Sequence, residues 1–448
     1  MEVKNVKGTK DIFGLEASRY QKVETIMKSV ATLYNFQEMR PPMMEHSDVF
    51  VRGVGEGSDI VRKEMYTFLD KGERSLTLRP EFTAGIMRTI VQNKLYATQD
   101  LPLKYYYCGP AFRYERPQLG RYRQFIQFGV ELVGCSSVMH QLDVIALGYT
   151  ILKSLGFENL TLKINTLGDD ESREAYKKAL KDFFKDHIDN MCPDCKSRFE
   201  INPLRILDCK VPADQLIVKD APKMSDYLTD AARERFETLQ HYLELAEIAY
   251  EVDDTLVRGL DYYSETVFEF HYVSKKNNNY GAIGAGGHYD KLVNELGGPL
   301  LPGIGFSLGV DRVVSALTDD GVFENELTED KIAAVVLPVG EESKDYAFII
   351  AQALRMNGYS IDIIYDNVKL GSMIKKAVRK NAKYAIIIGE NEIANESIVL
   401  KDLESGEQQV VKFDDLLETF DELFDQHECH CHDGECDCHC GRHDGGDN

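Results

Sequence analysis

The sequence predicts a protein of the α/β class, in which a larger α+β part precedes a small domain of alternating strands and helices. Three patterns predict this: an aromatic, β-prone hairpin at residues 103–134, a glycine-rich, strand-like stretch at 256–312, and alternating strands and helices after residue 330. The length of 448 residues suggests roughly three domains. A composition of 43% hydrophobic and 28% charged residues excludes a mostly disordered or fibrous protein.

The chain is acidic, with a net charge of −22 from 74 acidic and 52 basic residues. It is therefore not a general polyanion binder, and any contact with nucleic acid must come from local basic patches. No run of about 18 apolar residues is present, which predicts no transmembrane helix and no membrane partner. A polar N-terminus and few, scattered cysteines in the main body predict a reducing, cytoplasmic location.

The first part of the chain begins with a predicted amphipathic helix at residues 17–34. Its apolar side chains recur every three or four residues, at Tyr20, Val23, Met27, Val30 and Leu33. After this helix, paired prolines ending at Pro42 force the chain into an extended conformation. Later segments predict the hairpin strands 103–114 and 123–133, a helix at 141–155 and a mostly helical, charged stretch at 170–250.

The last part predicts a small α/β domain with a largely parallel sheet, because apolar strands alternate with helices at short spacing. The predicted strands are 332–337, 361–365 and 384–388, and the predicted helices are 343–356 and 370–380.

The second hairpin strand carries the first motif that could bind a ligand. Odd-numbered residues share one face of a strand, which puts these side chains in a row: Arg123, Phe125, Gln127, Gly129 and Glu131. Phe125 could stack on a base, Arg113 of the opposite strand could neutralise phosphate, and Gln127 and Glu131 could meet a small polar ligand. A solvated sheet face is the alternative interpretation.

Glu81 and Thr83 form a second motif, in which an acid and a hydroxyl two residues apart could receive an ammonium group. A threonine that caps a helix is the alternative. Arg258, next to Gly259, offers a planar fork for carboxylate or phosphate. The glycines of residues 284–290 match neither a dinucleotide nor a P-loop pattern. Arg312, in the first turn of a predicted helix, is a candidate phosphate contact.

Together these segments resemble the class II aminoacyl-tRNA synthetases and, within them, the histidyl-tRNA synthetases. The extended segment at Pro42, the hairpin at 112–125 and the segment ending at Arg312 are similar to the three class II motifs. Segments 256–270 and 285–298 resemble the two motifs of the histidine enzymes.

The resemblance implies an antiparallel-sheet class II core at residues 1–328, with a helical insertion at about 170–250. Residues 329–425 resemble the anticodon-binding domain. We expect residues 426–448 to be a disordered tail rich in Cys and His.

The activity that the resemblance implies is ATP-dependent ligation of L-histidine to histidine tRNA through a histidyl-adenylate, with release of AMP and pyrophosphate. ATP would be bound with Mg²⁺ by Arg113, Phe125 and Arg312. Histidine would be bound by Glu81, Thr83, Gln127, Glu131, Arg258, Tyr262 and Tyr263. Arg113 and Arg258 would be the catalytic residues, flanking the α-phosphate and the carboxylate.

The resemblance also implies a homodimer, built through the segment near Pro42 and the preceding helix. Contacts with tRNA would come from basic residues of the hairpin loop and of one C-terminal helix, which are Arg116, Arg121, Arg123, Lys375, Lys376, Arg379, Lys380 and Lys383. A solvated charged face is the alternative for that helix.

Two positions depart from the family pattern. The family usually has Arg where this chain has His288, and Thr with a varied neighbour where it has Ser264 and Glu265. Neither position is assigned to the reacting atoms. A non-enzymatic relative, the synthetase-like regulatory subunit of the phosphoribosyltransferase that begins histidine biosynthesis, is the rival interpretation, but such proteins generally lack the anticodon domain.

Two cysteine groups raise the question of metal binding. Cys192, Cys195 and Cys209 have suitable spacing for zinc with His187 as a fourth ligand, but from the sequence we favour three free thiols. The tail offers a second group of thiols and imidazoles that suits Zn²⁺, Ni²⁺ or copper(I), consisting of Cys429, His430, Cys431, His432, Cys436, Cys438, His439 and Cys440. A metal-storage or metal-sensing protein is suggested by this tail alone.

Overall fold

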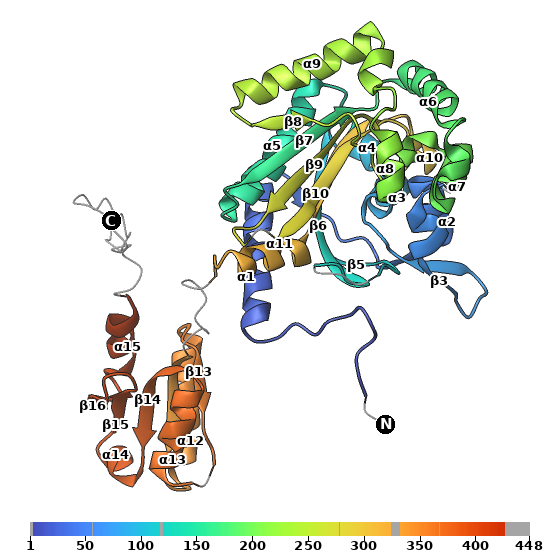
Figure 1. Ribbon diagram of the computed structural model, residues 1–448. Helices are drawn as coiled ribbons and strands as arrows, with labels where there is room; N and C mark the ends of the chain where they lie inside the picture. The colour runs from blue at the N-terminus through green and yellow to red at the C-terminus, as the bar shows by residue number, and fades with distance from the viewer. Residues whose placement is uncertain are drawn as a thin grey trace. The chain divides into compact units, whose positions relative to one another are not determined.

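The computed structural model describes residues 3–55, 57–116, 120–276, 278–323, 332–366 and 368–425. The chain divides into two compact units, Met1–Leu327 and Thr328–Asn448. Each unit is built on its own main sheet and hydrophobic core (Figure 1). Within the described ranges, no helix combines the length and apolarity needed to cross a membrane.

The first unit is organised around an eight-stranded sheet with the order β1-β5-β6-β11-β10-β9-β7-β8. Its strands are β1 (Gln37–Glu38), β5 (Leu103–Phe112), β6 (Gln124–Val133), β7 (Leu160–Thr166), β8 (Tyr250–Val252), β9 (Ser264–Val273), β10 (Asn279–Tyr289) and β11 (Gly303–Gly309). The pairs at the two ends, β1 with β5 and β7 with β8, are parallel, and the other pairs are antiparallel. The predicted hairpin is confirmed as β5 and β6.

One face of this sheet is covered by four helices (Figure 1), which are α1 (Leu15–Leu33), α5 (Val138–Ser154), α9 (Asp230–Leu245) and α11 (Val310–Asp319). The even-numbered residues Phe128, Val130 and Leu132 of β6 are fully buried in this layer. The predicted apolar stripe of α1 is buried as far as Val30, whereas Leu33 is 83% exposed because it ends the helix beyond the core.

The opposite face meets a small sheet of order β2-β4-β3, several short helices and the insertion. The small sheet consists of β2 (Met44–His46), β3 (Tyr66–Leu69) and β4 (Ser75–Leu78). The short helices are α2 (Ser47–Val54), η1 (Ile60–Glu64), α3 (Thr83–Gln92), α4 (Leu95–Thr98) and α10 (Leu292–Glu295). Between β7 and β8 the chain is helical as predicted, with α6 (Asp170–Phe184), η2 (Ile188–Asn190), α7 (Pro193–Ile201), η3 (Pro203–Ile206), α8 (Pro212–Val218) and η4 (Met224–Tyr227) preceding α9.

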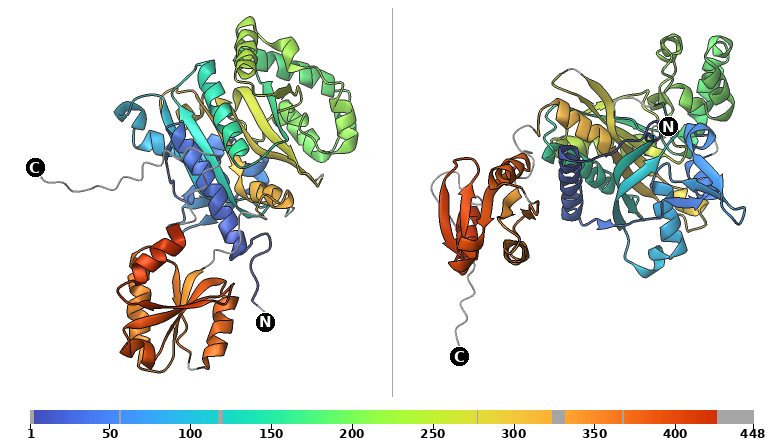
Figure 2. Two further views of the ribbon diagram at one scale, coloured as in Figure 1. Left: turned by 90° about the vertical axis from the view of Figure 1, so that its left-hand side faces the viewer. Right: turned by 90° about the horizontal axis from the view of Figure 1, so that it is seen from below.

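The second unit has a five-stranded sheet with helices on both of its faces (Figure 2). In the order β13-β12-β14-β15-β16, its strands are β13 (Ile361–Ile363), β12 (Ile332–Pro338), β14 (Ala382–Ile388), β15 (Ser397–Asp402) and β16 (Gln408–Lys412). Its helices are α12 (Ser343–Met356), α13 (Leu370–Arg379), α14 (Glu390–Ala394) and α15 (Leu416–Asp425). The first three strands are parallel, but β15 and β16 join antiparallel. The prediction of a largely parallel sheet was therefore wrong for the C-terminal half, where two strands follow β14 with no long crossover between them.

Candidate active site

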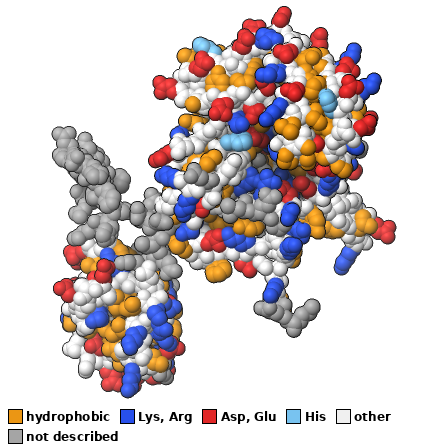
Figure 3. Space-filling view, in the orientation of Figure 1, with side chains coloured by type: hydrophobic (Ala, Val, Ile, Leu, Met, Phe, Trp, Pro, Cys, Tyr) orange, Lys and Arg blue, Asp and Glu red, His pale blue; other side chains and the backbone are white. Residues whose placement is uncertain are grey.

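A cavity of about 380 Å³ opens on the face of the large sheet that the four helices leave free. The structure brings all ten predicted site residues around it: Glu81, Thr83, Arg113, Phe125, Gln127, Glu131, Arg258, Tyr262, Tyr263 and Arg312. Lys and Arg side chains gather at the hollow in this unit (Figure 3), although the chain as a whole is acidic.

The floor of the pocket is formed by the odd-numbered residues of β6, as the period of two predicts. Phe125, Gln127 and Glu131 line the pocket. Gly305 of β11 lies opposite Glu131 in register, and a Cβ atom there would lie 2.1 Å from Glu131 Oε2. Only glycine leaves room for the carboxylate at this point of the floor.

Glu131 is the most enclosed acid of the pocket, with 1% of its surface exposed. Thr83 Oγ1 donates to its Oε1 at 2.6 Å, and the hydroxyl of Tyr289 donates to its Oε2 at 2.7 Å. Burial raises the pKa of Glu131 to about 8, although these two hydrogen bonds oppose the shift. The carboxyl group is thus fixed in place and titrates near neutral pH.

Glu81 lies just before α3 and satisfies the first N–H groups of this helix. Its carboxylate accepts from Thr83 N at 2.6 Å and from Ala84 N at 2.9 Å. Burial raises the pKa of Glu81. The helix start is therefore capped by Glu81, and the hydroxyl of Thr83 is directed to Glu131 instead.

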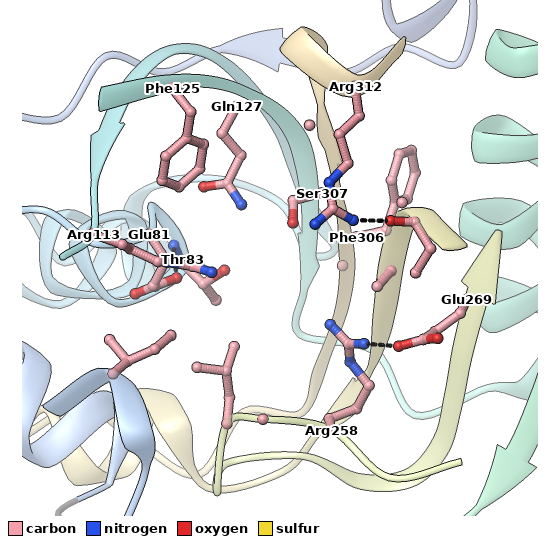
Figure 4. A pocket seen from close by; sticks show the side chains of 18 of the residues that line it. Glu81, Thr83, Arg113, Phe125, Gln127, Arg258, Glu269, Phe306, Ser307 and Arg312 are labelled. Carbon is pink, nitrogen blue, oxygen red and sulfur yellow. Dashed lines mark hydrogen bonds and ion pairs between the residues drawn. The ribbon is translucent and has the colours of Figure 1, made fainter. Parts of the chain in front are cut away.

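Three arginines from distant segments surround the cavity. Arg113 donates from Nε to Pro80 O at 2.8 Å, and its guanidinium carbon lies 5.3 Å from the centre of the Phe125 ring. Arg258 forms an ion pair with Glu269, and Arg312 donates to a backbone carbonyl of β10. The side chains of Phe125, Arg258 and Arg312 point toward the same space (Figure 4).

The electrostatics of two of these arginines differ. Burial, together with the positive charges of neighbouring arginines, lowers the pKa of Arg312 to about 10. Burial would also lower the pKa of Arg258, but Glu269 raises it above its ordinary value. Both groups remain cations at neutral pH, so the cavity presents positive charge to a ligand.

Four buried polar atoms of pocket-lining side chains lack a hydrogen-bond partner among the described residues. They are Oε1 of Gln127, Nε of Arg258, and Nε and Nη1 of Arg205. Buried polar atoms are almost always paired in native proteins. An acceptor and donors left open around one cavity indicate a polar ligand that carries both kinds of group.

The pocket is also lined by residues that the sequence analysis did not assign to a site. Tyr107, Glu269 and Tyr289 line the pocket, where Glu269 pairs with Arg258 and Tyr289 holds Glu131. The signal for Glu269 was present, because it alternates with the buried Phe268 and Phe270 along β9. Tyr107 and Tyr289 gave no such signal, since buried tyrosines are common in any core.

Besides Glu81 and Glu131, five carboxylates line the cavity and bear on magnesium binding. They belong to Asp59, Glu64, Glu115, Glu269 and Asp311. Oxygen ligands of this kind, together with substrate phosphates, are those that Mg²⁺ takes in nucleotide-binding sites. The residues present therefore fit a magnesium–nucleotide complex.

This chain departs from the family pattern at His288 and at the pair Ser264 and Glu265. These residues lie outside the pocket lining and contact each other. Ser264 Oγ lies 3.4 Å from Nδ1 of the buried His288 and donates to Asp290 at 2.6 Å. Glu265 Oε2 lies 3.8 Å from the same nitrogen and pairs with Arg235 at 2.8 Å. The unusual residues thus form one local cluster at the ends of β9 and β10.

Only one of the two cysteine groups singled out in the sequence lies among the described residues. The tail ligands Cys429, His430, Cys431, His432, Cys436, Cys438, His439 and Cys440 lie outside the described residues. The insertion brings Cys192, Cys195 and Cys209 together, but their fourth neighbour is Asp214. His187, the fourth ligand of the zinc alternative, does not belong to this group, and its ring centroid lies 5.3 Å from that of Phe183.

Comparison with known proteins identifies the family to which this chain is similar. The sequence model described as "Histidyl-tRNA synthetase" matches residues 8–313, and the model described as "Anticodon binding domain" matches residues 333–423. The chain is 45% identical to the "Histidine--tRNA ligase" of Bacillus licheniformis over 414 residues, which cover 92% of this chain and 96% of the relative.

Solved structures agree with the sequence match. The apo histidyl-tRNA synthetase of S. aureus superposes with a TM-score of 0.79 at 34% identity, covering 94% of this chain and 100% of that one. A Bacillus halodurans structure titled "ATP phosphoribosyltransferase regulatory subunit/histidyl-tRNA synthetase" has a TM-score of 0.62 at 20% identity, covering 87% and 99%, and shares the fold. The family model matches most of the first unit, and the sequence identity to the relative extends over nearly the whole chain. The protein therefore belongs to the histidyl-tRNA synthetase family.

Proposed function

We propose that the pocket activates L-histidine with ATP and that the protein then transfers the histidyl group to histidine tRNA. The observation that carries this proposal is the arrangement of Arg113, Arg258 and Arg312 around a floor that ends in the buried Glu131. Cations suit a triphosphate and a carboxylate, and a buried acid suits the N–H groups of the amino acid.

ATP would lie on the Phe125 side of the pocket. Its adenine would stack on Phe125, its α-phosphate would contact Arg113, and its outer phosphates would contact Arg312. Stacking of a base on an aromatic ring next to a guanidinium is supported by the 5.3 Å distance between Arg113 and the Phe125 ring. Magnesium, held by the phosphates with one or two of the lining carboxylates such as Glu64 or Glu115, would supply further positive charge to the phosphates.

Histidine would lie deeper in the pocket. Glu81 and Thr83 would receive its amino group, and the open Oε1 of Gln127 would accept from the same ammonium. Glu131 and Tyr263 would contact the imidazole. A site that hydrogen-bonds both ring nitrogens rejects amino acids that lack them, by about 10⁴–10⁵-fold in comparable enzymes.

Tyr262 would shape the wall of the histidine site. Its ring packs on Tyr263 at 4.5 Å and on Tyr289 at 5.7 Å between centroids. Such packing restricts both tyrosines, so the imidazole would meet pre-oriented hydroxyl groups.

The reaction follows from these positions in two steps. A carboxylate oxygen of histidine attacks the α-phosphorus of ATP, the bond to the bridging oxygen breaks, and pyrophosphate leaves with its electron pair. Arg113 and Arg258 would stabilise the charge that develops on the α-phosphate. A hydroxyl at the 3′ end of the tRNA then attacks the adenylate carbonyl, loses its proton and releases AMP.

A test of this function is ATP–pyrophosphate exchange with histidine, followed by charging of histidine tRNA. We expect exchange that depends on histidine and does not occur with other amino acids. A regulatory relative without catalysis would bind histidine but would show no exchange. The matched anticodon-binding domain favours the enzyme over that alternative.

Contacts with tRNA would involve the basic residues that remain exposed. Lys375 and Arg379 of α13 and the following Lys380 are exposed, but Lys380 pairs with Asp362 and the half-buried Lys376 pairs with Asp366. We therefore expect Lys375 and Arg379 to contribute most. This helix would belong to an anticodon-binding domain at 329–425.

In the catalytic domain, at residues 1–328, the hairpin loop would contact the acceptor end. Arg116 and Arg121 are exposed, whereas Arg123 lies over the Tyr114 ring at 3.8 Å. We therefore expect Arg116 and Arg121 to contribute more to tRNA binding than Arg123. Contacts of this kind weaken with salt.

We further propose a homodimer built through α1 and the segment around Pro42. Met43 and Met44, which follow this proline, are 50% and 54% exposed, and β1 forms an edge of the large sheet. Apolar side chains beside a sheet edge suit burial against a second copy. A monomer that persists at all concentrations in sedimentation and still charges tRNA would contradict this proposal.

We also propose that the tail, residues 426–448, binds Zn²⁺ or Ni²⁺ through its interleaved thiols and imidazoles. This would be an added property of the enzyme. The free thiols of the described residues suit a reducing cytoplasm, in which such ligands stay available.

A further inference from the structure

A second cluster of reactive side chains lies in the helical insertion, apart from the pocket. Cys192, Cys195, Cys209 and Asp214 each offer one ligand atom, and these four atoms all lie within 4.8 Å of one another. We propose that this cluster binds one zinc ion, which fixes the fold of the insertion.

The distances match a tetrahedral site. The Sγ atoms of Cys192 and Cys209 are 3.9 Å apart, and Cys209 Sγ lies 3.2 Å from Asp214 Oδ2. Zinc–sulfur bonds of about 2.3 Å in a tetrahedron put two sulfur ligands about 3.8 Å apart. Four protein ligands complete the coordination of zinc and leave no open position, which is typical of a structural site.

The backbone already holds the sulfur atoms as metal ligands require. Cys192 caps α7, where the N–H of Cys195 donates to Cys192 Sγ at 3.4 Å. Likewise, the N–H of Val211 donates to Cys209 Sγ at 3.5 Å. N–H donors and the start of a helix both stabilise the negative thiolate that binds metal.

Asp214 is the least expected member of the cluster, because it is a buried acid. Only 2% of its surface is exposed, and its Oδ2 accepts from Cys192 N at 3.1 Å. Among the described ion pairs none includes Asp214, and the nearby Lys210 pairs with Asp208 instead. The same oxygen also accepts from the thiol of Cys209. Zinc would displace the proton of this thiol and so put a cation between the sulfur atom and the carboxylate.

The metal would act on the active site through the segment that its ligands enclose. Arg198 and Arg205, between the second and third cysteines, both pair with Asp59 at 2.9 Å. Asp59 and Arg205 line the cavity. A zinc ion that ties α7 to α8 would therefore hold these arginines against the wall of the pocket.

The test is alkylation of the full-length protein after chelation, with and without added zinc sulfate, analysed peptide by peptide. This separates the cluster from the tail. We expect zinc to slow alkylation of Cys192 at least about tenfold. Alkylation of Cys108, a half-buried free thiol of β5 outside the insertion, should not change. Equal rates at Cys192 with and without zinc, or a disulfide between Cys192 and Cys209 in the untreated protein, would overturn the proposal.

Two variants provide a check on the fourth ligand. Asp214→Ala should weaken zinc binding at the cluster by at least about tenfold. Asp214→Cys should retain it, because four thiolates also complete a tetrahedral site. If the alanine variant protects Cys192 as well as the native protein does, Asp214 is not a ligand. Should that variant fail to fold, the native protein with and without zinc still decides the proposal.

Discussion

The hydroxyl of Tyr289 donates to Glu131 Oε2 at 2.7 Å and so joins β10 to β6 across the intervening strand β11. The contact is possible because β11 places Gly305 beside Glu131. One carboxylate is thus held by residues far apart in sequence, and its direction is set before any ligand arrives.

We expect Glu131→Gln to raise the KM for histidine by about 10- to 100-fold, with a much smaller change in the KM for ATP. The amide keeps the shape of the side chain but cannot ionise, so it cannot offer a carboxylate to an imidazole N–H when histidine binds. Pyrophosphate exchange, with each substrate varied in turn, gives both constants.

Tyr289→Phe serves as the matched control for this substitution. It removes one donor to Glu131 and leaves the carboxylate and its contact with Thr83 in place. The KM for histidine should rise less than in Glu131→Gln. If Glu131→Gln shifts both Michaelis constants equally, this residue does not bind the histidine side chain.

The raised pKa of Glu131 also makes stability depend on pH. Its pKa is about 8 in the folded protein and about 4.5 in the unfolded chain, so between these values the folded state holds a proton that the unfolded state has lost. The stabilisation from this group is fully present below about pH 4.5 and is lost as the pH rises through 8.

Glu131→Gln cannot lose this proton. We therefore subtract the Tm of the native protein from the Tm of the variant, both measured without ligands. This difference should increase as the pH rises from 5 to about 9. Parallel Tm curves for the two proteins would show that Glu131 titrates in its ordinary range.

Arg258→Ala should lower the rate of pyrophosphate exchange by about 10²–10³-fold, because it removes a fixed cation from the developing charge on the α-phosphate. Glu269 keeps a partner in His271, 2.7 Å away, so the fold should survive. Circular dichroism checks this point. Arg235→Ala is the control, because it removes an ion pair of 2.8 Å with Glu265 outside the pocket. Near-native exchange in a folded Arg258→Ala protein would refute the catalytic role.

Gly305→Ala should disrupt the floor of the pocket. The new Cβ would lie 2.1 Å from Glu131 Oε2 and 2.4 Å from Val130 O, so the strands must separate or the carboxylate must move. We expect destabilisation by about 1–3 kcal/mol and a higher KM for histidine. Gly371→Ala is the control, since no atom lies within 4 Å of its new Cβ and the site is helical. A Gly305→Ala protein with unchanged Tm and KM would show that the floor adapts.

The sequence predicted the parts of this site that depend on local periodicity. Phe125, Gln127 and Glu131 share a face because strands have a period of two, and Phe128 and Val130 turn to the core for the same reason. The start of the hairpin and the bounds of α12 also follow from local patterns.

The features that could not be predicted from the sequence depend on contacts between distant segments. Tyr289 becomes a partner of Glu131 only when β10 and β6 flank a strand with glycine at position 305. In the same way, Asp214 replaces His187 beside the insertion cysteines because the turn into α8 brings it back to α7. The antiparallel ending of the second sheet was missed because the direction of a strand depends on the partner that it meets, and because β16 is mostly exposed and carries polar residues.

Truncation after Phe424 should leave aminoacylation unchanged and remove most tight binding of zinc or nickel. The residues from 427 onward hold five of the ten cysteines and five of the eleven histidines, with no apolar side chain larger than Cys, so they add ligands but no core. Elemental analysis after dialysis measures the metal, and charging of histidine tRNA measures activity. A full-length variant with serine at the eight predicted tail ligands separates the loss of ligands from the loss of length. Equal metal content in the full-length and truncated proteins would show that the tail is not the site, and would leave the insertion cysteines with Asp214 as the ligands.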